Sequence, residues 1–282
     1  MLNIEEQLAY ITTRIETEDG NGNLYSGTGF FFNLKMPNGT REQIIVTNKH
    51  VVKDMVKGTF FLTERKNEQD APNDGVYMRI KMDGFEQMWI QHPSPDVDLC
   101  IMPLKPLLIF SHNQYNKHFF YRCIGEEQLP KESDYEYINA ISEVLMIGYP
   151  HGIWDDVNNR PIIRKGLTAT DVKFDFKGQK EFVIDMACIP GSSGSPIVVY
   201  NNGMVTTRSG NLELGKTLFY LLGILHAGPI MTIEGKIEVK SIPTGLKSVP
   251  VAKSGVMINL GYCVKSQYLL DFIPMLNALY RK

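Results

Sequence analysis

The sequence has little that would direct the chain to a membrane, to nucleic acid or out of the cell. It contains no run of about 20 apolar residues, the length that a helix needs to span a bilayer. Residues 1–8 are acidic and have neither the basic nor the apolar region of a secretory signal. The 29 Lys and Arg residues nearly balance the 31 Asp and Glu residues, with no long run of one sign. This balance argues against a nucleic-acid or membrane surface.

Cysteine is also scarce. The four cysteines, Cys100, Cys123, Cys188 and Cys263, are scattered and do not form the paired framework of a secreted domain. We therefore expect reduced, mostly buried thiols. No arrangement of histidines has the spacing of a zinc site, so neither a metal nor a cofactor is expected. Together these features predict a cytoplasmic protein.

Short apolar, β-branched runs separated by turn residues occur throughout the chain. The strongest turn signal is Asn38-Gly39 between the apolar runs at residues 30–32 and 44–46, which predicts a β-hairpin. The chain has 282 residues, of which 43% are hydrophobic. It can therefore bury a substantial core, either as one domain or as two closely packed halves. From residue 111 to 133 the pattern becomes polar and aromatic, which predicts a connection between two halves and a boundary near residue 125.

The segment Pro190-Gly191-Ser192-Ser193-Gly194-Ser195-Pro196 has glycines on both sides of a serine and a proline at its end. Such a backbone turns sharply, so Ser193 projects from the apex while neighbouring N–H groups converge. That geometry suits an activated serine with an oxyanion hole. Taken alone, the same residues are more typical of a surface turn, so the rest of the chain must decide.

A serine hydroxyl becomes a good nucleophile when a histidine takes its proton and a carboxylate orients that histidine. His50 follows the apolar run at residues 44–46, and Asp98 directly precedes the run at residues 99–102. The order His, Asp, Ser differs from the Ser, Asp, His order of α/β-hydrolases. Two alternatives stay open: Asp96 as the carboxylate, and His50 as a buried histidine satisfied by backbone groups.

These motifs resemble those of trypsin-like serine peptidases, and they are most similar to the protease domain of the HtrA (Deg) type. Six blocks follow the order of that family: residues 26–30, 47–52, 98–101, 147–152, 191–196 and 223–228. Their joint order is much more specific than any block alone. The resemblance implies an all-β, chymotrypsin-like fold of two packed six-stranded antiparallel β-barrels with a C-terminal α-helix.

The resemblance also implies the organisation of the chain. Residues 1–125 would form the N-terminal barrel with His50 and Asp98, and residues 126–282 the C-terminal barrel with Ser193 and the final helix. Within the second barrel, the Lys, Gly, Pro and Ser residues of the segment 229–256 predict a loop insertion near the substrate cleft. Ser266 is expected to cap the helix and Pro274 to kink it. Few residues follow, so we do not expect the PDZ module that is common in HtrA proteins.

A serine endopeptidase acting on a protein or peptide substrate is the function that the resemblance implies. Ser193 would be the nucleophile, His50 the general base and acid, and Asp98 the residue that orients His50. The N–H groups of Gly191 and Ser193 would form the oxyanion hole. The implied substrate-binding residues are Ala187, Cys188, Ile189, Leu225, His226, Ala227 and Gly228.

The P1 preference rests on two of these residues. Ala187 stands where relatives that cut after Lys or Arg have a carboxylate, so a small or medium apolar P1 side chain is expected. His226 offers an alternative, because a histidine in the pocket wall recognises Glu or Gln in some relatives. Their histidine stands one position earlier on the strand, so alternation predicts that His226 points elsewhere.

Two functions from other classes were compared with this one. A pseudoprotease that holds peptides without cutting them typically lacks a triad residue, and none is missing here. An esterase of the α/β-hydrolase type needs G-x-S-x-G, which the G-S-S-G-S of residues 191–195 does not match.

Ser192 lacks the charge of the aspartate that zymogens of the trypsin type pair with a new amino terminus. We therefore expect activity without amino-terminal processing, controlled by a regulatory protein partner or by homo-oligomerisation.

Overall fold

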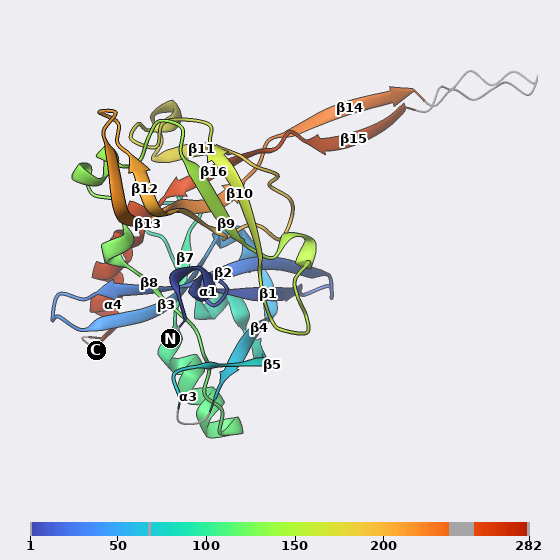
Figure 1. Ribbon diagram of the computed structural model, residues 1–282. Helices are drawn as coiled ribbons and strands as arrows, with labels where there is room; N and C mark the ends of the chain where they lie inside the picture. Colours follow the sequence, from blue (N-terminus) through green and yellow to red (C-terminus); the bar gives the residue numbers. More distant parts are fainter. Residues whose placement is uncertain (1, 67–68, 237–250, 281–282) are drawn as a thin grey trace, which may run out of the picture.

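The computed structural model describes residues 2–66, 69–236 and 251–280 (Figure 1). Most of the chain forms two β-sheet units. The first unit runs from β1 (Thr12–Asp19) to β8 (Ile124–Gly125), and the second runs from β9 (Glu143–Gly148) to β16 (Leu260–Lys265). The expected all-β chain with two antiparallel sheets and a C-terminal helix is confirmed. No helix in the described ranges is long and apolar enough to cross a membrane.

The first unit is an eight-stranded sheet. Its order is β5-β4-β1-β2-β3-β7-β6, and β8 pairs with β2 in the parallel direction. The further strands are β2 (Leu24–Lys35), β3 (Arg41–Thr47), β4 (Met55–Arg65), β5 (Pro72–Asp83), β6 (Ile90–Gln91) and β7 (Cys100–Pro103). In the described residues β5 and β6 are ends of the path, so this sheet is not the closed six-stranded barrel that we expected. The 3-10 turn η1 (Phe85–Met88) lies between these two strands in the chain, and β6 has only two residues.

The predicted hairpin at Asn38-Gly39 joins β2 to β3. Phe30 pairs with Val46 and Lys35 pairs with Arg41, while Gly39 has a φ of 82°. A positive φ is a conformation that glycine adopts readily. The hairpin ends at Thr47, three residues before His50.

The second unit closes into a barrel in the order β10-β11-β16-β13-β12-β9. Its further strands are β10 (Ile162–Thr168), β11 (Glu181–Asp185), β12 (Pro196–Thr206) and β13 (Leu212–Ala227). The sequence did not predict β10. Along this strand Ile163 and Leu167 are exposed, while Arg164 is partly buried, which reverses the usual pattern of apolar residues inside.

Residues 229–256 differ from the irregular loop that we expected near the cleft. β14 (Ile230–Lys236) and β15 (Val251–Met257) pair along their whole lengths as a two-stranded antiparallel sheet. Figure 1 shows this hairpin extending away from the two sheet units. Residues 237–250 of the expected insertion lie outside the described residues.

The helices are short and lie between or after the strands: α1 (Ile4–Leu8), α2 (Lys49–Val52), α3 (Leu104–Tyr115), η2 (Glu126–Gln128), η3 (Glu132–Glu136), η4 (Pro150–Gly152), η5 (Phe176–Gly178), η6 (Ser266–Phe272) and α4 (Ile273–Tyr280). Ser266 does not cap the C-terminal helix, because its Oγ donates a hydrogen bond to the carbonyl of Leu221 (2.6 Å). Pro274 is the second residue of α4. A missing N–H is tolerated in this first turn, so Pro274 does not interrupt the helix.

One hydrophobic core joins the two units. Phe30 and Val46 of the first sheet share a cluster with Val198 and Leu221 of the second, and Leu276 of α4 packs into it. Because this core is continuous, the two units form a stable contact along which residues far apart in sequence meet.

Candidate active site

His50 and Asp98 meet at the edge of the first unit. His50 lies in the one-turn helix α2, directly after β3, and Asp98 lies just before β7. β3 and β7 are adjacent, with Thr47 paired to Cys100, so the two residues are brought together. His50 Nδ1 lies 2.5 Å from Asp98 Oδ2, and the backbone N–H of His50 donates to Asp98 Oδ1 (3.1 Å). The carboxylate therefore bonds the histidine twice, whereas Asp96 is exposed on the surface.

Asp98 is held in its charged form. Burial raises the pKa of its carboxyl group, but the hydrogen bonds and the charge of His50 lower it more, so the pKa lies below its ordinary value of 3.8. The side-chain amide of Asn48 donates to the carbonyl of Asp98 (2.7 Å), which fixes the backbone at this position. A fixed carboxylate on Nδ1 favours the histidine tautomer that has Nε2 free to accept a proton.

The serine turn has the backbone that its glycines predict. Gly191 has a φ of 87° and Gly194 a φ of 85°, values that L side chains rarely adopt. A Cβ at Gly194 would overlap the carbonyl oxygen of Thr28, and one at Gly191 would lie 2.5 Å from the carbonyl oxygen of Tyr149. Ser193 stands between these glycines and is partly exposed.

Two N–H groups at this turn are available for a ligand. Within the described ranges, the N–H groups of Gly191 and Ser193 donate no hydrogen bond, whereas that of Ser192 donates to the carbonyl of Ile189 (3.1 Å). These are the two donors that we expected to bind an oxyanion. Ser193 Oγ likewise makes no hydrogen bond to a described residue, His50 included.

Thr28 of β2 connects the first unit to the serine turn. It is fully buried, and its N–H donates to the carbonyl of Ser193 (2.9 Å). Its Oγ1 donates to the carbonyl of Gly191 (3.0 Å) and accepts from the N–H of Tyr149 (3.1 Å) and from Ser195 Oγ (3.3 Å). The sequence placed Thr28 inside a glycine-rich motif but did not indicate this role, which exists only when the two units are packed together.

The expected substrate-binding residues differ in how far they are exposed. Ala187 is exposed, while Cys188 and Leu225 are buried in the core of the second barrel. A Cβ at Gly228 would lie 3.5 Å from Cys188 Cβ, so these two segments are in close contact. Ile189 and Ala227 are partly buried. Of the expected set, His226 lines a cavity in the described part of the chain, and residues 187–189 are not among the residues that line it.

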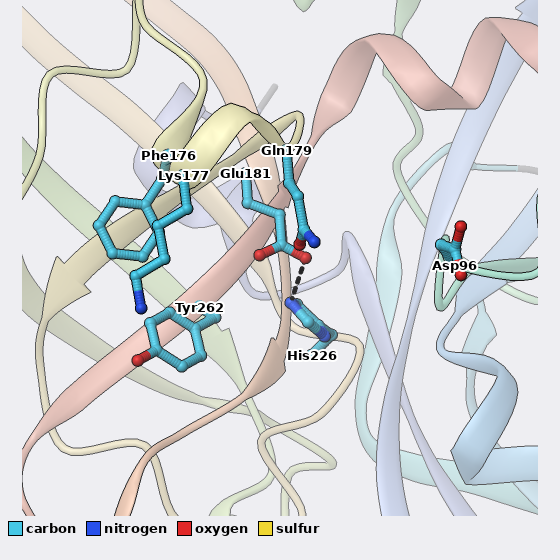
Figure 2. A pocket seen from close by; sticks show the side chains of 7 residues that line it. All are labelled: Asp96, Phe176, Lys177, Gln179, Glu181, His226 and Tyr262. Carbon is cyan, nitrogen blue, oxygen red and sulfur yellow. Dashed lines mark ion pairs between the residues drawn. The ribbon is translucent and has the colours of Figure 1, made fainter.

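His226 lies in a cavity of about 470 Å³, close enough to His50 and Asp98 for their charges to act on it. The cavity is lined by Asp96, Phe176, Lys177, Gln179, Glu181, His226 and Tyr262, and Figure 2 shows His226 facing Glu181. His226 Nε2 lies 3.1 Å from Glu181 Oε1, although the angle does not suit a hydrogen bond. Burial lowers the pKa of His226 more than Glu181 and Asp98 raise it, so the pKa lies below its ordinary value of 6.5.

Strand alternation did not predict the place of His226. The pairing of β13 with β16 shifts between Leu225 and Ala227, so His226 is the extra residue of a β-bulge. A bulge turns its extra side chain out of the regular alternation. The cavity that His226 lines does not include residues 187–189, so the expectation that His226 points away from the P1 pocket stays a prediction.

The cysteines and the possible metal ligands were the other candidate groups for chemistry in the described residues. Cys100, Cys188 and Cys263 are buried, Cys123 is partly buried, and all four are free thiols. Burial raises the pKa of Cys188 to about 11, so this thiol is neutral near pH 7. Among the residues that the structure describes, no group of three or more His, Cys, Asp or Glu is placed to hold a metal ion.

Comparison with known proteins agrees with the class that the sequence motifs predict. The profile of the trypsin-like peptidase domain matches residues 27–206, more than half of the chain, so the chain belongs to this family. The expected membership among trypsin-like peptidases is confirmed. No curated protein matches the sequence.

Several solved structures resemble the chain at low identity. The Rv3671c protease from M. tuberculosis, in its active form, is 13% identical, with 94% of this chain and 80% of that chain covered and a TM-score of 0.41. A catalytically inactive tobacco etch virus protease complexed with substrate is 11% identical, with 98% and 87% covered and a TM-score of 0.48. A second structure of the tobacco etch virus protease, in which a cysteine is replaced by alanine, is also 11% identical, with 97% and 81% covered and a TM-score of 0.46.

Proposed function

We propose that this trypsin-like peptidase is a serine endopeptidase with Ser193, His50 and Asp98 as its catalytic triad. The observation that carries the proposal is the pair of contacts that joins His50 to Asp98, through Nδ1 (2.5 Å) and through the backbone N–H (3.1 Å). This pair orients the imidazole and leaves Nε2 as the base. The free N–H groups of Gly191 and Ser193 support an oxyanion hole at the same turn.

The reaction would proceed through an acyl-enzyme. His50 Nε2 takes the proton of Ser193 Oγ as this oxygen attacks the scissile carbonyl carbon, and the carbonyl oxygen becomes an oxyanion bound by the N–H groups of Gly191 and Ser193. His50 then gives the proton to the leaving amine, and the C–N bond breaks. Water repeats these steps on the ester, which releases the acid and restores Ser193. Throughout, Asp98 remains charged and stabilises the imidazolium, consistent with its lowered pKa.

The substrate would be a specific protein, cut after a small or medium apolar P1 residue in the cytoplasm. Ala187 supports this preference because it brings no charge to the expected P1 position. Each half of the chain would supply part of the triad, with residues 1–125 carrying His50 and Asp98 and residues 126–282 carrying Ser193. A regulatory partner or a second copy of the chain would control activity.

The alternative is a pseudoprotease that binds peptides without cutting them. One observation favours it: Ser193 Oγ makes no hydrogen bond to His50 within the part of the chain that the structure describes. Such bonds are often long in the absence of substrate and tighten in the complex, so the observation weakens the catalytic proposal only slightly.

Labelling with a fluorophosphonate probe distinguishes the two functions. We expect labelling at Ser193 that is lost in Ser193→Ala and in His50→Ala, but retained in His112→Ala, where an exposed histidine of α3 is replaced. Asp98→Asn should lower peptide turnover by about 10⁴, as a lost triad carboxylate does, while Asp96→Asn should have little effect. A folded wild-type protein that is not labelled would favour the pseudoprotease. Severe loss in Asp96→Asn with a mild effect of Asp98→Asn would reassign the carboxylate.

A further inference from the structure

Arg164 reaches from the barrel wall to the segment that leads into Ser193. It lies on β10, and its guanidinium touches residues 187–192 at two points. Nη1 donates to the carbonyl oxygen of Ala187, and Nη2 donates to Ser192 Oγ (2.7 Å). Ser192 is fully buried and directly precedes the expected nucleophile. One side chain thus ties both ends of this segment to the barrel.

The setting of this arginine is unusual for a charged group. Arg164 is partly buried, and no carboxylate among the described residues pairs with it. Burial lowers the pKa of its guanidinium, and its buried Nε has no hydrogen-bond partner. A buried cation without a counter-ion is unfavourable for stability. Such departures from the usual rules are expected where a residue serves the active site.

We propose that Arg164 is a positioning residue that holds residues 187–192 in the conformation that leaves the N–H groups of Gly191 and Ser193 without an acceptor in the described chain. This inference rests on the proposed serine endopeptidase function. The planar guanidinium suits the task because its two Nη groups bond two acceptors at once, which a single ammonium group cannot do with the same geometry. Both Nη groups bond this segment, so Arg164 is in a position to support the turn.

Other groups hold the middle of the same segment. The N–H of His151 donates to the carbonyl of Pro190 (2.6 Å), and Thr28 Oγ1 donates to the carbonyl of Gly191 (3.0 Å). The N–H and the C=O of a trans peptide point in opposite directions. Because His151 binds the carbonyl of Pro190, the N–H of Gly191 points away from His151. Arg164 fixes the two ends at Ala187 and Ser192, so its loss leaves His151 and Thr28 to hold the middle of a segment whose ends are no longer fixed.

The test measures the second-order rate of fluorophosphonate labelling at Ser193 in Arg164→Ala, Arg164→Lys and Lys165→Ala. Lys165 is the matched control, because it is the next residue of β10, is exposed and, among the described residues, pairs only with the exposed Glu143 (2.8 Å). We expect Arg164→Ala to be labelled about 100-fold more slowly than wild type, comparable with the loss of an oxyanion donor. Arg164→Lys should be intermediate, and Lys165→Ala should match wild type.

Chemical rescue separates positioning from general stability. Guanidinium ion at non-denaturing concentration should restore labelling of Arg164→Ala by binding Ala187 and Ser192 in place of the lost side chain. It should not accelerate Lys165→Ala or Ser193→Ala. A merely structural role predicts the reverse, since guanidinium destabilises folded proteins.

Each outcome decides the inference. A folded Arg164→Ala that is labelled as fast as wild type overturns it and leaves the proposed function intact. A rate loss that follows thermal stability and is not rescued also overturns it. If Arg164→Ala does not fold, Arg164→Lys and Ser192→Ala carry the test, and wild-type rates in both overturn it. A wild-type protein that is not labelled overturns both proposals.

Discussion

Replacing Thr28 by valine tests whether the first unit holds the serine turn. Valine keeps the branched shape of threonine and removes only the hydroxyl group. That hydroxyl donates to Gly191 and accepts from Tyr149 and Ser195, all in a fully buried site. The substitution therefore removes three hydrogen bonds without opening a cavity.

The size of the effect follows from these contacts. Each hydrogen bond contributes about 1 kcal/mol net, and a buried N–H left without a partner costs about 1–3 kcal/mol. The N–H of Tyr149 would be such a group, because Thr28 Oγ1 is its acceptor. We expect the free energy of unfolding to fall by about 2–4 kcal/mol, which lowers the Tm by about 5 °C for a chain of this size. The rate of fluorophosphonate labelling should fall about tenfold, less than for a lost oxyanion donor because the N–H of Gly191 remains.

Thermal unfolding and labelling rates at a temperature where all variants are folded provide the measurement. Thr28→Ser is the matched control, since it keeps the hydroxyl and loses one methyl group. It should keep a labelling rate near that of wild type. If Thr28→Val were as stable as wild type, or if Thr28→Ser were equally slow to label, the hydrogen bonds of Thr28 would not be the reason for order at the turn.

Three further predictions concern specificity, pH and activation. When a peptide library varied at P1 is digested, the cleaved peptides should carry mostly small or medium apolar P1 residues, because Ala187 brings no charge. Cleavage mostly after Lys or Arg would contradict this. Cleavage mostly after Glu or Gln that is lost in His226→Ala would favour recognition by His226. The pKa of Asp98 lies below 3.8, so its contribution to stability is present above that pH and is lost as the pH falls through the native value. In urea unfolding, the stability difference between wild type and Asp98→Asn should stay constant above about pH 5 and shrink below about pH 4; a constant difference at low pH would disprove the linkage. An uncleavable amino-terminal fusion should be labelled at the wild-type rate, because Ser192 bonds Arg164 and needs no new amino terminus; labelling only after removal of the fusion would show that processing is required.

The sequence predicted those parts of the site that depend on local pattern. His50 and Asp98 each lie next to a buried strand, and Ser193 lies in a turn whose glycines require positive φ. These features are visible in a few consecutive residues. The expected class and the hairpin before His50 were therefore confirmed by the fold.

The parts that were missed depend on contacts between distant segments. β10 has its apolar side chains Ile163 and Leu167 exposed and Arg164 partly buried, so no periodic pattern indicated a strand or a buried cation. His226 lies in a bulge whose position is set by the pairing of β13 with β16. Neither a reversed pattern nor a register shift can be seen in one strand alone.

The contact of Thr28 with the serine turn explains why two sequence blocks far apart in the chain occur together. Gly194 has no room for a Cβ because the carbonyl oxygen of Thr28 approaches it, and the N–H of Thr28 bonds the carbonyl of Ser193. The backbone of β2 therefore requires a glycine at position 194. The serine turn in turn depends on β2 for a donor, the N–H of Thr28, and for an acceptor, Thr28 Oγ1. The blocks at residues 26–30 and 191–196 are two sides of one contact between the units. Packing of the units and order at Ser193 are therefore coupled, and a substitution that weakens the contact should change both.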